Sequence, residues 1–116
     1  MGMIDELKAL GADTDDALTR FMGNTELFER MLKKLPKVVE EAPVMPYLKS
    51  GDPDMAMTNA HTLKGVIGNL SLTPLYNGYA EVVDLLRDEK PEKAAAQFEK
   101  TLSLQNDILE CIKKYM

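Results

Sequence analysis

The sequence has a single histidine and a single cysteine among its 116 residues, and it has no tryptophan. Cys111 has no second cysteine with which to form an internal disulfide. No set of His, Cys, Asp and Glu residues follows the spacing of a metal site, and no Cys-His pairing suited to nucleophilic catalysis is present. We therefore expect no bound metal and no cofactor, and His61 is the one residue left that could react covalently.

Long apolar runs and an excess of positive charge are also missing. No apolar run approaches the roughly 20 residues that a membrane span requires, and the first residues match neither a signal peptide nor a myristoylation site. The net charge of −5 argues against nucleic-acid binding, because that function needs clustered Lys and Arg. No Gly-rich phosphate loop indicates a nucleotide site. We expect a cytoplasmic monomer that binds neither membranes nor nucleic acids.

The apolar residues that are present recur at helical spacing, and no segment alternates with a period of two. A content of 45% hydrophobic and 28% charged residues is ordinary for one globular domain, here residues 1–116. Residues 3–11 predict a short first helix, and Asp13 or Thr14 can cap the next turn. Because connections of about three to five residues favour antiparallel neighbours, the sequence predicts an all-α protein. Its architecture would be an up-down antiparallel four-helix bundle with a short additional N-terminal helix.

Prolines mark several helix boundaries. Asp52-Pro53 and Thr73-Pro74 each predict an N-cap followed by proline at the first helical position, and Pro91 can begin the last helix. Pro36 lies inside an apolar helical pattern, where it should kink or restart the helix because it lacks an N–H donor. The sequence leaves open whether residues 36–49 form one continuous helix.

The stretch from Asn59 to Leu70 has two opposed faces when it is read at about 100° per residue. One face is an apolar stripe suited to a core, made of Leu63, Val66, Ile67 and Leu70. The other face carries residues spaced i, i+3, i+4 and i+7, namely His61, Lys64, Gly65 and Gly68. The histidine therefore points away from the core. Two glycines leave the backbone bare beside it, although each costs about 1 kcal/mol in a helix interior.

The segment Ala60-His61-Thr62-Leu63-Lys64-Gly65, followed by Gly68-Asn69-Leu70, resembles the phosphoacceptor motif of histidine-containing phosphotransfer (HPt) domains. These domains are four-helix bundles that relay phosphoryl groups between receiver aspartates, and the resemblance extends from about Asp13 to the C-terminus. It implies that His61 accepts a phosphoryl group from one receiver aspartate and passes it to another. The chain would then be a phosphotransfer intermediate without a nucleotide site, not an enzyme in its own right. Its partners would be response-regulator receiver domains and a hybrid sensor histidine kinase. The sequence departs from the family at three positions, Ser71, Gly78 and Val83.

The neighbours of His61 take roles from this resemblance. Lys64 would stabilise the phosphoryl oxygens, and any Mg²⁺ would belong to the receiver. Gly65 would let the receiver approach closely, and Gly68 would extend the same opening. Four residues near the same side of the helix could form a docking rim: Asp54, Met57, Thr58 and Leu72. The structural alternatives are ordinary solvated side chains for His61 and Lys64 and tight helix packing for the glycines.

Two other functions are compatible with the same residues. The chain could be a binding-only module that docks a receiver or a kinase without carrying phosphate. It could also be the phosphoacceptor domain of a chemotaxis-type histidine kinase, which shares the H-x-x-K-G pattern with the HPt family.

Overall fold

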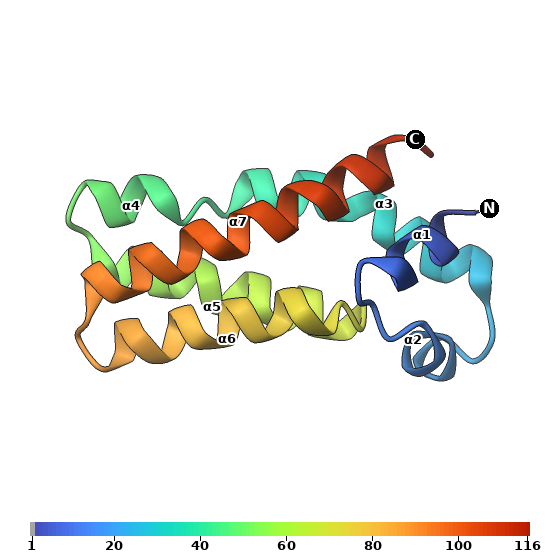
Figure 1. Ribbon diagram of the computed structural model, residues 1–116, viewed down its shortest axis with the longest axis horizontal. Helices are drawn as coiled ribbons and strands as arrows, with labels where there is room; N and C mark the ends of the chain where they lie inside the picture. Colours follow the sequence, from blue (N-terminus) through green and yellow to red (C-terminus); the bar gives the residue numbers. More distant parts are fainter. Residues whose placement is uncertain (1) are drawn as a thin grey trace.

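The computed structural model describes residues 2–116, and this part of the chain is all-helical, as the sequence predicts. No strand occurs in these residues. Two short helices precede the long ones where the sequence predicts one (Figure 1). In chain order the helices are α1 (Met3–Ala9), α2 (Thr14–Arg20), α3 (Thr25–Glu41), α4 (Met45–Lys49), α5 (Pro53–Asn69), α6 (Thr73–Arg87) and α7 (Pro91–Lys113).

The long helices lie side by side along the molecule. Helix α6 packs against both α5 and α7, α3 lies against α7, and α4 contacts α5 and α7. Figure 1 shows that α5, α6 and α7 run in alternating directions, so the turn between α5 and α6 lies near α2 and the turn between α6 and α7 lies at the far end. Helices α1 and α2 cover the first of these ends, where α1 also contacts α7. Within residues 2–116, no helix combines the length and the apolarity needed to cross a bilayer.

Helix α6 supplies much of the core. The residues that the sequence predicts to face inward are all buried: Leu75, Tyr79, Val82, Val83 and Leu86. Each such side chain stabilises the fold by about 1.5–3 kcal/mol relative to an exposed position. Gly78 lies where α6 approaches α7, and a Cβ at this residue would be 2.6 Å from Oγ1 of Thr101. The glycine therefore allows the two helices to pack closely.

Most predicted boundaries are confirmed, and two need correction. Asp52 accepts a hydrogen bond from Met55 N–H at 3.1 Å, and Pro53 is the first residue of α5. Helix α3 does not restart at Pro36 but runs through it to Glu41. The chain leaves helical structure only at residues 42–44, before the short α4.

The second correction concerns the start of α6. The sequence predicts Thr73 as the N-cap, but Thr73 is the first helical residue. Leu72 occupies the N-cap position, and no side chain caps the helix there. The carbonyl of Leu72 accepts the hydrogen bond of Tyr76 N–H at 2.9 Å. The Thr73 hydroxyl instead donates to the Ser71 carbonyl at 3.4 Å. The boundary moves by one residue because the preceding turn fixes the backbone of Ser71 and Leu72.

The ends of the described chain are joined through Glu6. Its carboxylate accepts hydrogen bonds from Lys114 Nζ, at 2.5 Å, and from the hydroxyl of Tyr115. These bonds, with Lys114 contributing most, lower the pKa of the Glu6 carboxyl, and the same pairing raises the pKa of the Lys114 ammonium. Glu6 therefore fastens α1 to the end of α7.

Candidate functional site

The histidine lies in the middle of α5. Leu63 and Ile67 of the same helix are buried, with exposed fractions of 1% and 0%, whereas His61 is exposed. Within residues 2–116 no hydrogen bond or ion pair involves the imidazole. The predicted opposition of the two faces is present, and the His61 side chain can be approached from solvent.

The two glycines of the exposed face differ in what surrounds them. A Cβ at Gly65 would meet no atom within 4 Å beyond the helix backbone, so the surface beside Lys64 is open. A Cβ at Gly68 would lie 2.9 Å from Cδ1 and 3.0 Å from Cε1 of Tyr76. Gly65 therefore meets the expectation of a clearing, whereas Gly68 serves the close packing of the Tyr76 ring from α6. The prediction that Gly68 extends the clearing is wrong.

Three of the four predicted rim residues are accessible. Asp54 and Thr58 are exposed and Met57 is half-buried, all on the N-terminal side of His61 along α5. The Thr58 hydroxyl donates to the Asp54 carbonyl at 3.0 Å, which holds this side chain against its own helix. These residues can border a docking surface.

Leu72 is the exception, because its side chain is fully buried at 0% exposure. The reason lies in the turn that ends α5. Leu72 N–H donates to the Ile67 carbonyl at 3.3 Å, and Ser71 N–H donates to the Gly68 carbonyl at 3.1 Å. This pair of bonds is a Schellman motif, in which an apolar side chain at the position of Leu72 commonly packs back on the last turn of the helix. Leu72 therefore belongs to the core and not to a docking rim.

A hollow of about 470 Å³ lies next to the exposed face of α5. Three helices and the turn between α5 and α6 line it, through Asp16, Arg20, Lys64, Gly65, Gly68, Asn69, Ser71, Leu72, Thr73 and Tyr76. Sequence reasoning missed the contributions of α2 and of Tyr76. The only local signal for the α2 residues is the i, i+4 spacing of Asp16 and Arg20, which gives no indication that α2 lies beside α5.

Asp16 connects α2 to the turn after α5. Its Oδ2 accepts a hydrogen bond from the Ser71 hydroxyl at 2.6 Å and another from Arg20 Nε at 2.8 Å. The Ser71 bond and then the Arg20 bond lower the pKa of the Asp16 carboxyl. A backbone bond from Asp13 N–H to the Ser71 carbonyl, at 2.9 Å, joins the same two segments. The two bonds to Ser71 fix α2 at one edge of the hollow.

Comparison with known proteins identifies no relative: no family model, no curated protein and no solved structure matches the chain. Among the side chains of residues 2–116, no group of three or more His, Cys, Asp and Glu is arranged to hold a metal ion. The features of the molecule that bear on its function are the motif of α5 and the arrangement around His61.

Proposed function

We propose that this protein is a histidine phosphocarrier of the HPt type, which accepts a phosphoryl group on His61 from a receiver aspartate and passes it to the aspartate of a second receiver. In the first step the lone pair of one ring nitrogen forms a bond to phosphorus. The P–O bond to the aspartate breaks as this bond forms, and the carboxylate leaves with the bonding electrons. The second step is the same exchange in reverse, with a different carboxylate as the acceptor.

One observation carries the proposal. His61, Lys64 and the open Gly65 share a face of α5 whose opposite side is core. A nucleophile for a protein-bound phosphoryl group must be reachable by another macromolecule, and the bare backbone at Gly65 gives room for it. An ordinary surface histidine would not require a glycine one turn away, since glycine in a helix lowers stability by about 1 kcal/mol relative to alanine.

Lys64 supports the same function through charge. It lies one helical turn from His61 on the same face of α5, so its ammonium group can reach a phosphoryl group on the imidazole. A cation at this place stabilises the phosphoryl oxygens in the transition state and in the phosphohistidine. Mg²⁺, where the reaction uses it, would be held by the receiver.

The helices also fit the fold that this function implies. Helices α5, α6 and α7 with α3, extended by α4, would correspond to the four elements of an HPt bundle, and α1 and α2 would be additions at one end. In that arrangement the phosphoacceptor helix α5 has one face on the core and the other free for a receiver.

The test is phosphoryl transfer from receiver domains of the source organism, each first phosphorylated with acetyl phosphate. We expect acid-labile, base-stable label on the wild-type protein and none on His61→Gln. The variant should keep the wild-type melting temperature, because the side chain is exposed. Label that persists on His61→Gln would refute the proposal.

The same assay separates the two alternative functions. A binding-only module would bind a receiver without becoming labelled, although phosphoramidate, a small donor that needs no docking surface, could still label His61. A phosphoacceptor domain of a chemotaxis-type kinase would be labelled by a kinase catalytic domain with ATP and not by phosphorylated receivers.

A further inference from the structure

Ser71 adopts a backbone conformation that favours glycine. Its φ is +54°, and it occupies the position after the helix cap in the Schellman motif that ends α5. Glycine is the usual residue there because a Cβ is crowded by the backbone in the left-handed region. A serine at this place adds a hydroxyl group that glycine lacks.

What the serine supplies is the hydroxyl bond to Asp16. Ser71 is only 4% exposed, and its Oγ donates to Asp16 Oδ2 at 2.6 Å across 55 residues of sequence. The same carboxylate oxygen holds Arg20 through Nε. Within residues 2–116 this is the guanidinium's one hydrogen-bonded contact, so its two terminal amino groups remain available to a partner.

Arg20 and Lys64 therefore border the same hollow from two helices. Of the charged residues that line it, two are cationic and one is anionic, and the anion, Asp16, is already engaged by Ser71 and Arg20. The hollow thus has a net positive charge on a protein whose total charge is −5. This local charge favours an anionic group of the partner.

We propose that Arg20 is a docking residue that binds a carboxylate side chain on the receiver, and that Ser71 and Asp16 position it. This inference rests on the proposed phosphocarrier function. The planar guanidinium binds a carboxylate through two parallel hydrogen bonds. Because Asp16 fixes Nε, the terminal amino groups are oriented before the receiver arrives.

A receiver carboxylate fits the hollow better than the transferred phosphoryl group. The residues of α5 that line it, from Lys64 to Asn69, lie about 4.5 to 12 Å along the helix axis from His61. Lys64 is thus the lining residue of α5 nearest to His61 along the helix axis. Arg20, which comes from α2, contacts the partner beside the transfer centre.

The experiment compares Arg20→Gln with Arg87→Gln, using the receiver that labels the wild-type protein fastest. Arg87 is a matched control because it also pairs with a carboxylate in its own helix, Asp84, at 3.8 Å, and it is similarly exposed. It ends α6 at the far end of the molecule from α2 (Figure 1). Both variants change the total charge equally.

We expect Arg20→Gln to raise the receiver concentration for half-maximal transfer about fivefold or more, with the maximal rate unchanged. The half-maximal concentration should also depend less on NaCl than in the wild type. Arg87→Gln should match the wild type in both measurements. Arg20→Lys should recover part of the lost affinity, whereas Ser71→Ala, which keeps the backbone strain and removes the hydroxyl, should lose affinity in the same direction as Arg20→Gln.

Three results would overturn the inference. Equal behaviour of Arg20→Gln and Arg87→Gln would show that Arg20 is an ordinary surface arginine. A loss of affinity confined to the phosphorylated receiver would assign Arg20 to the phosphoryl group, because a carboxylate contact must weaken the unphosphorylated receiver as well. Absence of label on the wild-type protein from every receiver would refute the phosphocarrier function together with this inference, whereas the first two results leave that function intact.

Discussion

The ring of Tyr76 covers Gly68: a Cβ added to that glycine would lie 2.9 Å from Cδ1 of the tyrosine. The same addition at Gly65, less than one helical turn away, would meet no atom within 4 Å. The two glycines on one face of α5 thus have different structural roles. Gly68 allows α6 to pack closely, and Gly65 leaves space beside His61.

Alanine substitutions should distinguish the role of Gly65 from that of Gly68. Gly65→Ala should stabilise the fold by close to the full difference in helix propensity, about 0.8–1 kcal/mol. Gly68→Ala should fall short of that gain by about 1 kcal/mol, since the Tyr76 ring must move to admit the new methyl group. Urea unfolding of both variants measures the difference. Equal gains would show that Tyr76 does not constrain Gly68.

A larger residue at Gly65 tests the functional meaning of the clearing. Gly65→Gln should be neutral or stabilising by several tenths of a kcal/mol, and phosphoramidate should still label His61. Labelling by a phosphorylated receiver should be lost, because the side chain projects into the approach path. A lower melting temperature with unimpaired receiver transfer would contradict the assignment of this face.

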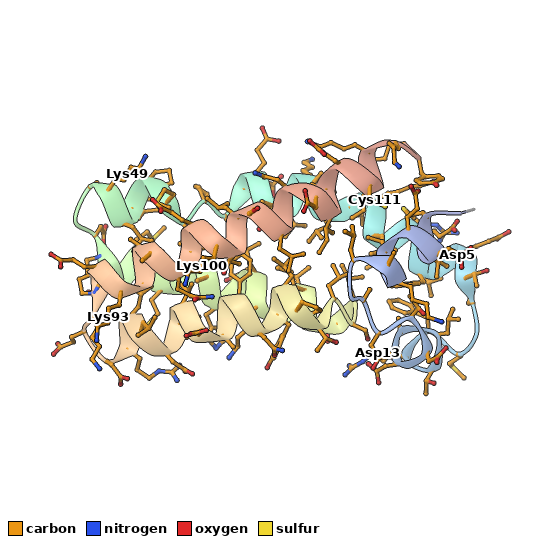
Figure 2. The ribbon with its side chains drawn as sticks, in the orientation of Figure 1. Asp5, Asp13, Lys49, Lys93, Lys100 and Cys111 are labelled. Atoms are coloured by element: carbon orange, nitrogen blue, oxygen red, sulfur yellow. The ribbon has the colours of Figure 1, made fainter. Side chains whose placement is uncertain are left out.

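Removal of the Lys64 charge should slow transfer without abolishing it. We expect Lys64→Ala to reduce the rate by roughly tenfold with either donor, because the ammonium stabilises charge on the phosphoryl oxygens but forms no covalent bond. Lys93→Ala is the control, since Lys93 lies in the first turn of α7, at the end of the molecule opposite Asp13 and α2 (Figure 2). Equal rates for the two variants would make Lys64 an ordinary surface lysine.

Met22 and Ser71 share a left-handed backbone conformation, with φ of +56° and +54°. Of the two, Ser71 makes a side-chain hydrogen bond, to Asp16. Met22 is 93% exposed. Met22→Gly should therefore stabilise the fold by about 0.5–1 kcal/mol. The substitution relieves about 1–2 kcal/mol of backbone strain, and the greater entropy of glycine in the unfolded chain offsets part of this gain. Ser71→Gly should give a smaller gain or a loss, because the bond to Asp16 disappears. Thermal unfolding of the two variants measures the difference. An equal gain in stability would show that the Ser71 hydroxyl has no structural role.

The bonds from Lys114 and Tyr115 to Glu6 predict a pH dependence of stability. Because the folded-state pKa of Glu6 lies below its ordinary value of 4.5, the contribution of its carboxylate is complete above that pH and is lost as the pH falls through the lower, folded value. The melting temperature of Glu6→Gln should therefore lie below that of the wild type near neutral pH, and the gap should close in acid. A gap that stays constant from pH 7 to acid would contradict the pairing.

The hydroxyl of Tyr79 donates to Oε1 of Gln105, and both residues are buried. Burial raises the pKa of this hydroxyl, which stays protonated as a donor. Tyr79→Phe should destabilise the fold by about 1–3 kcal/mol, because it leaves the Gln105 carbonyl buried without a donor. Combining it with Gln105→Met should recover much of that loss in urea unfolding. Additive losses in the double variant would show that the two residues are not coupled.

Much of the fold follows from local signals in the sequence. Asp52 and Pro53 start α5 where capping and the fixed φ of proline require it, and the spacing of Leu63 and Ile67 sets which face meets the core. These features depend on residues within one or two helical turns. For the same reason His61 could be placed on the exposed face before any neighbouring helix was known.

The tertiary structure decided what lies beside that face. Only the packing of α6 on α5 distinguishes the covered Gly68 from the open Gly65, since the two glycines follow the same helical spacing. The bond of Ser71 to Asp16, which brings Arg20 to the hollow, joins segments 55 residues apart. Helical periodicity determines the direction of a side chain about its own axis, but the atoms that meet it come from other helices whose positions depend on the whole core.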